Sequence, residues 1–218
     1  MRQITFGFSA LRRAVAAGVM ALVLAAGFTA PAAAASPAEQ FVNDNLQKGL
    51  GILTNKALSK DQRRDQFQDF LLSLADLKAI ANYTLGQYRR GASPADITAY
   101  ETAYKEYALA VYRTYFDKFS GQTLKVIGSY PLSGGEVVVK TVMYDPAKTT
   151  SGKPPVINFR LAPQGQKFLA TDISFEGVWL RQTQRDDFTS FLGQNNGDIK
   201  ALIGVLKNKT KQEQLHAR

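Results

Sequence analysis

The chain has 218 residues, of which 45% are hydrophobic and 21% charged, and its formal net charge is +9. This composition is ordinary for a globular protein with a substantial core, and it excludes a collagen-like, low-complexity or disordered chain. The sequence contains no cysteine and a single histidine, His216. Disulfides and thiolate metal sites are thereby excluded, and the histidine count argues against a zinc site or a Ser-His-Asp triad.

The first 35 residues have the pattern of an export signal. A basic start is followed by an apolar run from Ala14 to Phe28 and by the small residues Ala32-Ala33-Ala34-Ala35-Ser36. This order is typical of a secretory signal peptide. A membrane anchor is the alternative, but spanning a bilayer needs about 20 apolar residues. We therefore predict a signal peptide over 1–35, cleavage after Ala35, a periplasmic location and one domain over 36–218.

Residues 36–119 have the capping signals and apolar spacing of four helices. Two capping boxes begin at Ser36 and Ser59, Asp76 is placed to cap a short helix, and Ser93-Pro94 opens the longest one. Gly86 and Gly121 mark the ends of the third and fourth helices. The fourth helix carries an apolar and aromatic stripe at steps of three or four residues, namely Ile97, Tyr100, Tyr104, Tyr107, Val111, Tyr115 and Phe119.

After residue 123 the apolar period changes to two. Four runs, 124–130, 136–144, 156–161 and 168–175, are separated by turn-forming segments and predict an antiparallel four-stranded meander. On the last strand, alternation places Leu169, Thr171, Ile173 and Phe175 on one face. A helix over 179–194, a short one carrying Ile199 to Leu206 and a frayed basic tail from Lys207 complete the chain. Strands grouped between helices predict an α+β fold.

No common catalytic motif is present. The chain lacks a G-x-S-x-G elbow, a phosphate-binding loop, an H-E-x-x-H motif and a calcium loop. Asp172 lies in mid-strand, and burial of its face would raise its pKa and make it a candidate general base. The commoner arrangement is an exposed or salt-bridged carboxylate, and Arg160 and Lys140 are the mid-strand cations available as partners.

The aromatic content allows two interpretations. Nine Tyr and thirteen Phe gather in the long helix and the sheet. A tyrosine stripe is usually the core face of a helix, yet so many rings can also line an apolar cavity for lipid tails. Periodicity does not separate a filled core from a hollow one. The basic residues are spread along the chain and do not form the patch expected of nucleic-acid binding, so they indicate a solvated surface or a basic rim.

Several segments together resemble the MlaC, or toluene-tolerance, family of periplasmic phospholipid-binding proteins. They are Asp76-Leu77 with Thr84-Leu85-Gly86, the tyrosine-rich helix closing at Phe119-Ser120-Gly121, Asp172-Ile173 with Gly177-Val178-Trp179-Leu180, and Gly197-Asp198-Ile199. The chain departs from the family pattern at Trp179 and at Gln184, where tyrosine is usual. Gln184-Arg185-Asp186 is similar to the branch linked to hopanoid or other lipid transport.

The resemblance implies a lipid carrier. Its α+β fold would pack helices on an antiparallel twisted sheet, similar to that of NTF2-like proteins, around an apolar cavity for a phospholipid or related lipid. Its partners would be an inner-membrane ABC transporter with MCE domains and an outer-membrane lipoprotein–porin complex. It would have no catalytic activity, no metal and no cofactor besides the lipid cargo, and it would act as a monomer that binds no nucleic acid. We place Arg89, Arg90 and Arg185 at the mouth or docking surface. The predicted lining consists of Leu74, Ile80, Leu85, Tyr104, Tyr107, Val111, Val126, Val139, Ile157, Phe159, Ile173, Phe175, Phe188 and Phe191.

Two other functions fit parts of the same sequence. An NTF2-like enzyme would use a strand carboxylate such as Asp172 in a cone-shaped pocket, and it would turn over a substrate without copurifying lipid. A lipoprotein chaperone would hold a protein cargo in a hydrophobic groove.

Overall fold

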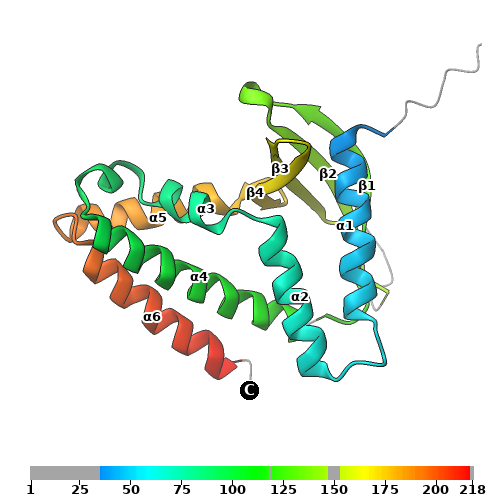
Figure 1. The fold of residues 1–218 in the computed structure, drawn as a ribbon, viewed down its shortest axis with the longest axis horizontal. Coiled ribbons are helices and arrows are strands. Elements are labelled where there is room, and N and C mark those ends of the chain that lie inside the picture. Colours follow the sequence, from blue (N-terminus) through cyan, green and yellow to red (C-terminus); the bar gives the residue numbers. More distant parts are fainter. Residues whose placement is uncertain (1–34, 118, 147–152, 217–218) are drawn as a thin grey trace, which may run out of the picture. The chain divides into compact units, whose positions relative to one another are not determined.

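The computed structural model describes residues 35–117, 119–146 and 153–216, and the predicted signal peptide up to Ala34 lies outside them. The elements of the unit Ala35–Arg218 follow one another as helices, then a sheet, then helices (Figure 1). They are α1 (Pro37–Leu53), α2 (Lys60–Leu74), α3 (Leu77–Thr84), the 3-10 helix η1 (Gly86–Gly91), α4 (Pro94–Asp117), β1 (Thr123–Pro131), the 3-10 turn η2 (Ser133–Gly135), β2 (Val137–Tyr144), β3 (Val156–Gln164), β4 (Lys167–Phe175), β5 (Val178–Trp179), α5 (Leu180–Gln194) and α6 (Ile199–His216).

The predicted caps begin the first three helices. Ser36 accepts a hydrogen bond from the Glu39 amide at α1, and Ser59 and Gln62 form a full capping box at α2. Asp76 accepts from the Ala79 amide at α3. Each cap satisfies backbone donors that the first turn of a helix leaves without partners, which fixes where the helix starts.

The α+β prediction is confirmed, but the strand count of four is wrong. The sheet has five antiparallel strands in the order β1-β2-β3-β4-β5. The additional strand is only two residues long and pairs with Ser174 and Phe175. Glu176 and Gly177 both have positive φ, so the chain reverses within two residues instead of leaving the sheet at Gly177.

Two β-bulges change which side chains share a face of the sheet. One lies between Val126 and Gly128 in β1, and the other lies beside Thr171, where Arg160 pairs with Asp172 and Leu161 with Ala170. The predicted alternation on the last strand is therefore wrong, because an extra residue inverts the pattern. Ala170 shares a face with Ile173 and Phe175, and Leu169 lies on the opposite one.

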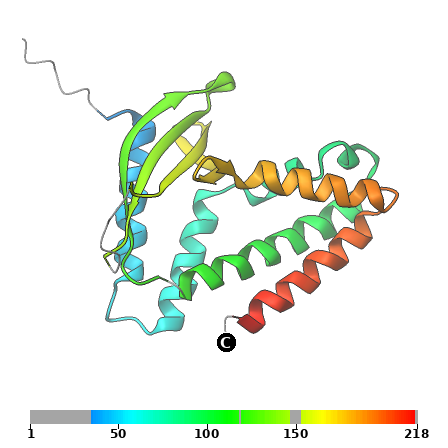
Figure 2. The same ribbon diagram turned by 180° about the vertical axis from the view of Figure 1, so that it is seen from behind.

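The prediction of a short final helix with a frayed tail is also wrong. α6 has 18 residues and continues to His216. Thr210 is buried and donates a hydrogen bond to the Leu206 carbonyl, so a further turn packs against the protein. Figures 1 and 2 show α6 lying alongside α4 for most of its length. Its exposed lysines occupy the outer side of a helix that tertiary packing stabilises.

Buried side chains form two separate cores. The helical core joins α3, α4, α5 and α6 around Leu85, Tyr100 and Leu192. The sheet core joins α1 to the sheet around Val42, Val139 and Leu161. α2 lies between these groups in both ribbon views. Among the described residues, no helix is both long and apolar enough to cross a membrane.

Candidate functional site

The face of the sheet that α1 packs on carries an apolar row that is only partly covered. Residues paired across antiparallel strands share a face, so Phe159 lies beside Ile173 and Ile157 beside Phe175. Ile173 is 40% exposed and Phe175 is 55% exposed. α1 reaches the start of β4, where the ring centroids of Phe41 and Phe168 lie 5.8 Å apart, but Ile173 and Phe175 at the end of β4 remain exposed and available for contact.

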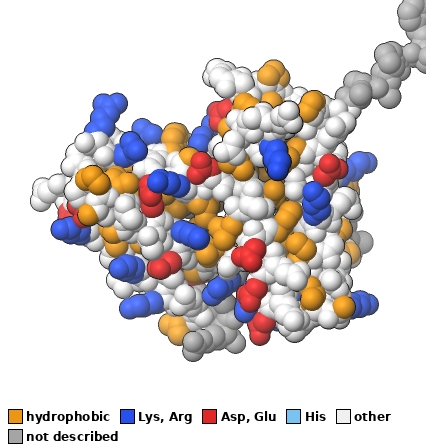
Figure 3. Space-filling model, viewed as in Figure 1, with side chains coloured by type: hydrophobic (Ala, Val, Ile, Leu, Met, Phe, Trp, Pro, Cys, Tyr) orange, Lys and Arg blue, Asp and Glu red, His pale blue; other side chains and the backbone are white. Residues whose placement is uncertain are grey.

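α2 faces this region, but none of its residues is buried. Its 15 residues include Phe67, Phe70, Leu71, Leu72 and Leu74, and none of the 15 is buried. None of these five side chains belongs to the helical core or the sheet core. Figure 3 shows hydrophobic side chains gathered between α2, α4 and β4. A helix with five large apolar residues and no buried position has an apolar surface that protein atoms cover only in part.

Four aromatic rings join α2 to α4. The ring centroid of Phe67 lies 5.9 Å from that of Phe70, 5.6 Å from that of Tyr112 and 6.5 Å from that of Phe116. Gly49 of α1 lies against this group, because a Cβ there would come within 3.0 Å of Phe67. We call Phe67, Phe70, Tyr112 and Phe116 the aromatic cluster. The sequence shows Phe67 and Phe70 at helical spacing, but spacing alone does not show that this face is left partly uncovered.

The predicted lining residues fall into three groups. Leu85, Tyr104 and Phe188 are buried in the helical core, with Ile80, Tyr107 and Phe191 packed against it. Val139 is buried in the sheet core, with Val126 and Phe159 packed against it. Leu74, Val111 and Ile157 are half-buried outside both cores, and Ile173 and Phe175 are exposed. The structure therefore buries the first group among helices and packs the second between α1 and the sheet, and only the third group lies outside both cores.

The three predicted docking arginines lie on η1 and α5. Arg89 and Arg90 are exposed on η1, where the Arg89 Nε donates to Asn82 Oδ1 over 2.7 Å. Arg185 lies on α5, with its guanidinium carbon 4.7 Å from the centroid of the Tyr83 ring. Arg185 thus helps to hold α5 against α3, whereas Arg89 and Arg90 remain accessible to a partner.

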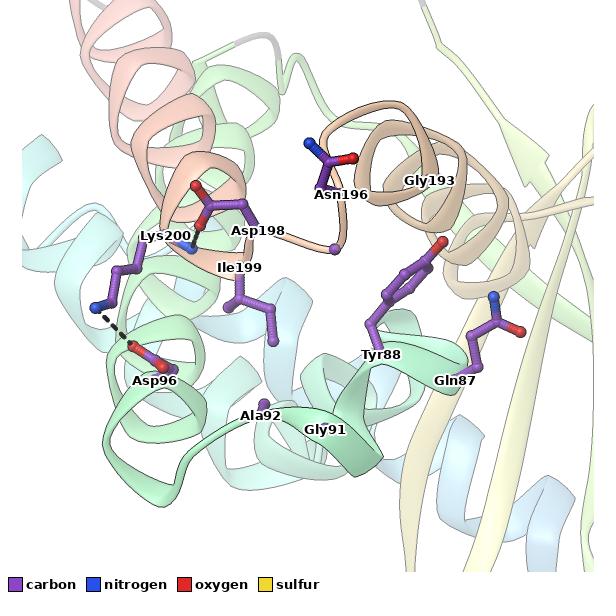
Figure 4. A pocket seen from close by; sticks show the side chains of 11 residues that line it. Gln87, Tyr88, Gly91, Ala92, Asp96, Gly193, Asn196, Asp198, Ile199 and Lys200 are labelled. Carbon is purple, nitrogen blue, oxygen red and sulfur yellow. Dashed lines mark hydrogen bonds and ion pairs between the residues drawn. The ribbon is translucent and has the colours of Figure 1, made fainter.

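A surface pocket of about 680 Å³ lies beside η1, between it and the turn from α5 to α6. Figure 4 shows the Tyr88 side chain reaching towards Gly193, whereas the Asp198 side chain at the start of α6 points away from Tyr88. The Asp198 carboxylate already accepts the amides of Lys200 and Ala201 at the start of α6. The pocket contains none of the predicted lining residues and is polar, so it does not suit an acyl chain.

Asp172 is buried, but its contacts indicate a structural role. Its Oδ1 accepts the backbone amides of Ile173 and of Arg181, over 2.9 and 2.8 Å. Its Oδ2 lies 3.7 Å from Arg181 Nε. Burial raises the pKa of Asp172, and these amides and Arg181 oppose that rise. Because Arg181 stands in the first turn of α5, the strand carboxylate caps that helix.

Gln184, where the family usually has tyrosine, also bonds within the protein. The Tyr104 hydroxyl donates to Gln184 Oε1 over 2.6 Å, which links α4 to α5. Among the described residues, no group of three or more His, Cys, Asp or Glu side chains could hold a metal ion.

Comparison with solved structures defines the class of fold. The chain is similar to a phospholipid-binding protein from Ralstonia solanacearum, determined in complex with a phospholipid, with a TM-score of 0.63 and 18% identity over 82% of this chain and 97% of that one. At this identity the match shows a shared fold. The family model of MlaC protein matches residues 43–208, so the chain belongs to the MlaC family.

Proposed function

We propose that the protein binds a phospholipid or a related lipid, with acyl chains lying between α2, α4 and the β3–β4 side of the sheet. The observation that carries this proposal is α2, with five large apolar residues and no buried position. Membership of the MlaC family and the phospholipid bound by the structural neighbour support it.

The physical requirement for carrying lipid fits this surface. Each methylene removed from water contributes about 0.8 kcal/mol, so an acyl chain binds where it can cover a continuous apolar area. Ile173 and Phe175 are exposed on β4, and in this proposal they extend the apolar area from α2 onto the sheet. The lining that we propose comprises the aromatic cluster and Leu71, Leu74, Val111, Ile157, Phe159, Ile173 and Phe175.

Membership of the MlaC family and the export pattern of residues 1–35 support a proposed route of transport. In this proposal, the protein moves lipid across the periplasm between an outer-membrane lipoprotein–porin complex and an inner-membrane ABC transporter with MCE domains. Arg89 and Arg90 would meet acidic surfaces of these partners. The protein acts as a carrier without turnover, and the lipid class, phospholipid or hopanoid, is what the first experiment identifies.

Native mass spectrometry of the protein purified from its periplasm tests the proposal directly. We expect a stoichiometric adduct, and solvent extraction of that adduct gives the lipid class. A mass without adduct after gentle purification, together with no uptake from phospholipid vesicles, would contradict lipid binding. Turnover that depends on Asp172 would instead support the enzyme alternative.

A matched pair of substitutions tests where the lipid lies. Ile173→Glu puts a charge on the proposed acyl surface, so we expect lipid occupancy to fall at least about tenfold because a buried unpaired charge is costly. Ile127→Glu makes the same change at a 51% exposed position on β1, three strands away, and should leave occupancy unchanged. Equal occupancy in both variants would exclude the end of β4 from the lipid site.

A further inference from the structure

The crossing of α2 and α4 holds three buried nitrogen and oxygen atoms that lack hydrogen-bond partners among the described residues. They are the Tyr112 hydroxyl, Arg113 Nε and Arg64 Nε. Buried polar atoms in proteins are nearly always hydrogen-bonded, so three such donors in one place call for an explanation. All three can donate, and two belong to positively charged groups, so a single partner for all three would have to be an anion with several oxygen atoms.

The contacts around these atoms bring them to one place. Arg113 Nη2 donates to Gln68 Oε1 over 3.3 Å, and the Tyr112 ring packs on Phe67. Gln68 and Phe67 lie four and three residues after Arg64, which is the spacing of neighbours on one helix face. Arg64 and Arg113 are also the positive charges that act on the Tyr112 hydroxyl, whose pKa burial raises above its ordinary value.

The surrounding acidic groups leave Arg113 as the principal cation of this cluster. Arg64 Nη1 is paired with Asp61 over 2.9 Å, and Arg64 Nε lies 3.5 Å from Asp65. The nearby Asp117 carboxylate lies 2.6 Å from the ammonium group of Lys60. The bond from Arg113 to Gln68 is long and involves a neutral acceptor, so its guanidinium keeps donors for a ligand.

Resting on the proposed function, we infer that Tyr112 and Arg113, assisted by Arg64, bind the phosphate group of the lipid cargo. The Tyr112 ring belongs to the aromatic cluster, and its hydroxyl ends among the arginines, so one residue spans the apolar and the charged part. A phospholipid has the same order of parts, with acyl chains joined to a phosphodiester. A guanidinium and a phenol hydroxyl together match phosphate oxygens in charge and in donor geometry.

Native mass spectrometry after incubation with vesicles tests this inference, using phosphatidylglycerol and a diacylglycerol with the same acyl chains. We expect Arg113→Gln and Tyr112→Phe each to lower phosphatidylglycerol occupancy by about tenfold, the effect of one charge-assisted hydrogen bond. Neither should change diacylglycerol occupancy, because that lipid has no phosphate. Lys105→Gln removes an exposed charge from the same helix and should change neither.

The outcomes separate this inference from the proposed function. Wild-type protein that takes up neither lipid contradicts the proposed function itself. Wild-type protein that takes up both, with phosphatidylglycerol occupancy unchanged in Arg113→Gln and Tyr112→Phe, overturns the phosphate site alone. A third outcome would assign the site to free phosphate. In that case wild-type protein takes up neither lipid but binds inorganic phosphate, and Arg113→Gln abolishes the phosphate binding. Thermal unfolding of each variant, with Arg113→Lys as the charge-conserving change, identifies loss of folding.

Discussion

At the scale of single residues, Asp172 shows how a buried carboxylate can serve the fold. It accepts two backbone amides and lies close to Arg181, whose side chain is 13% exposed. Arg181 also lies over the Tyr83 ring, with 4.2 Å between its guanidinium carbon and the ring centroid. β4, α5 and α3 therefore meet through one carboxylate, one guanidinium and one ring.

The raised pKa of Asp172 predicts a specific pH dependence of stability. Between the ordinary aspartate value of about 3.9 and the higher folded-state pKa, the folded protein holds a proton that the unfolded chain has released. The free energy of unfolding therefore loses a contribution as the pH rises through this window. Asp172→Asn does not titrate, so its stability relative to wild type should increase as the pH rises through the same window.

Urea denaturation of both proteins at a series of pH values measures that difference. Asp187→Asn removes an exposed negative charge from α5 and controls for net charge. A stability difference between Asp172→Asn and wild type that does not change with pH would contradict the prediction.

At the scale of elements, two glycines predict opposite responses to the same change. Gly86 ends α3 with a φ of 56°, and an added Cβ would lie 2.7 Å from Thr189 Cγ2. Gly86→Ala should lower the free energy of unfolding by about 1–2 kcal/mol from backbone strain alone. Gly204 lies exposed within α6 with no atom within 4 Å of an added Cβ, so Gly204→Ala should raise it by about 0.5–1 kcal/mol. Thermal or urea unfolding measures the change in the free energy of unfolding for each variant. Changes of the same sign in Gly86→Ala and Gly204→Ala would contradict the prediction.

The elements also show where sequence reasoning is sufficient and where it is not. Caps at Ser36, Ser59 and Asp76 are local signals, because a side chain three residues away satisfies each exposed amide. The bulge at Thr171 has no comparable local signal, since pairing with β3 decides it. The length of α6 was underestimated because it, too, depends on tertiary contacts. The turn after Leu206 packs against the protein through the buried Thr210, whereas the sequence there shows mainly charge.

Aromatic abundance and the family resemblance favoured an apolar lining, and the residues assigned to it remain a prediction. Among them, Ile173 and Phe175 are exposed on β4. Leu85 and Tyr104 have the same apolar spacing, yet they fill the helical core. Periodicity reports which face of a helix is apolar, whereas the neighbour that covers the face depends on the tertiary arrangement.

At the scale of the whole molecule, the distribution of buried residues predicts that α2 and α6 differ in local stability. α6 has Ile199, Leu202 and Leu206 buried in the helical core, whereas α2 has no buried residue. Elements with few buried apolar contacts open at lower free energy than core elements do. Amide hydrogens of α2 should therefore exchange faster than those of α6 in protein stripped of lipid.

Bound lipid should reduce this difference, because acyl chains would cover the apolar face of α2. Ligand that binds only the folded form stabilises it by mass action, by about 2.7 kcal/mol at a hundredfold excess over the dissociation constant. Hydrogen exchange measured by mass spectrometry, before and after incubation with phospholipid vesicles, should show slower exchange in α2 and little change within α6. Protection that rises equally in both helices would indicate general stabilisation, and unchanged exchange in α2 would place the acyl chains elsewhere. The same comparison in Ile173→Glu links the two tests, since a variant that takes up no lipid should keep rapid exchange in α2.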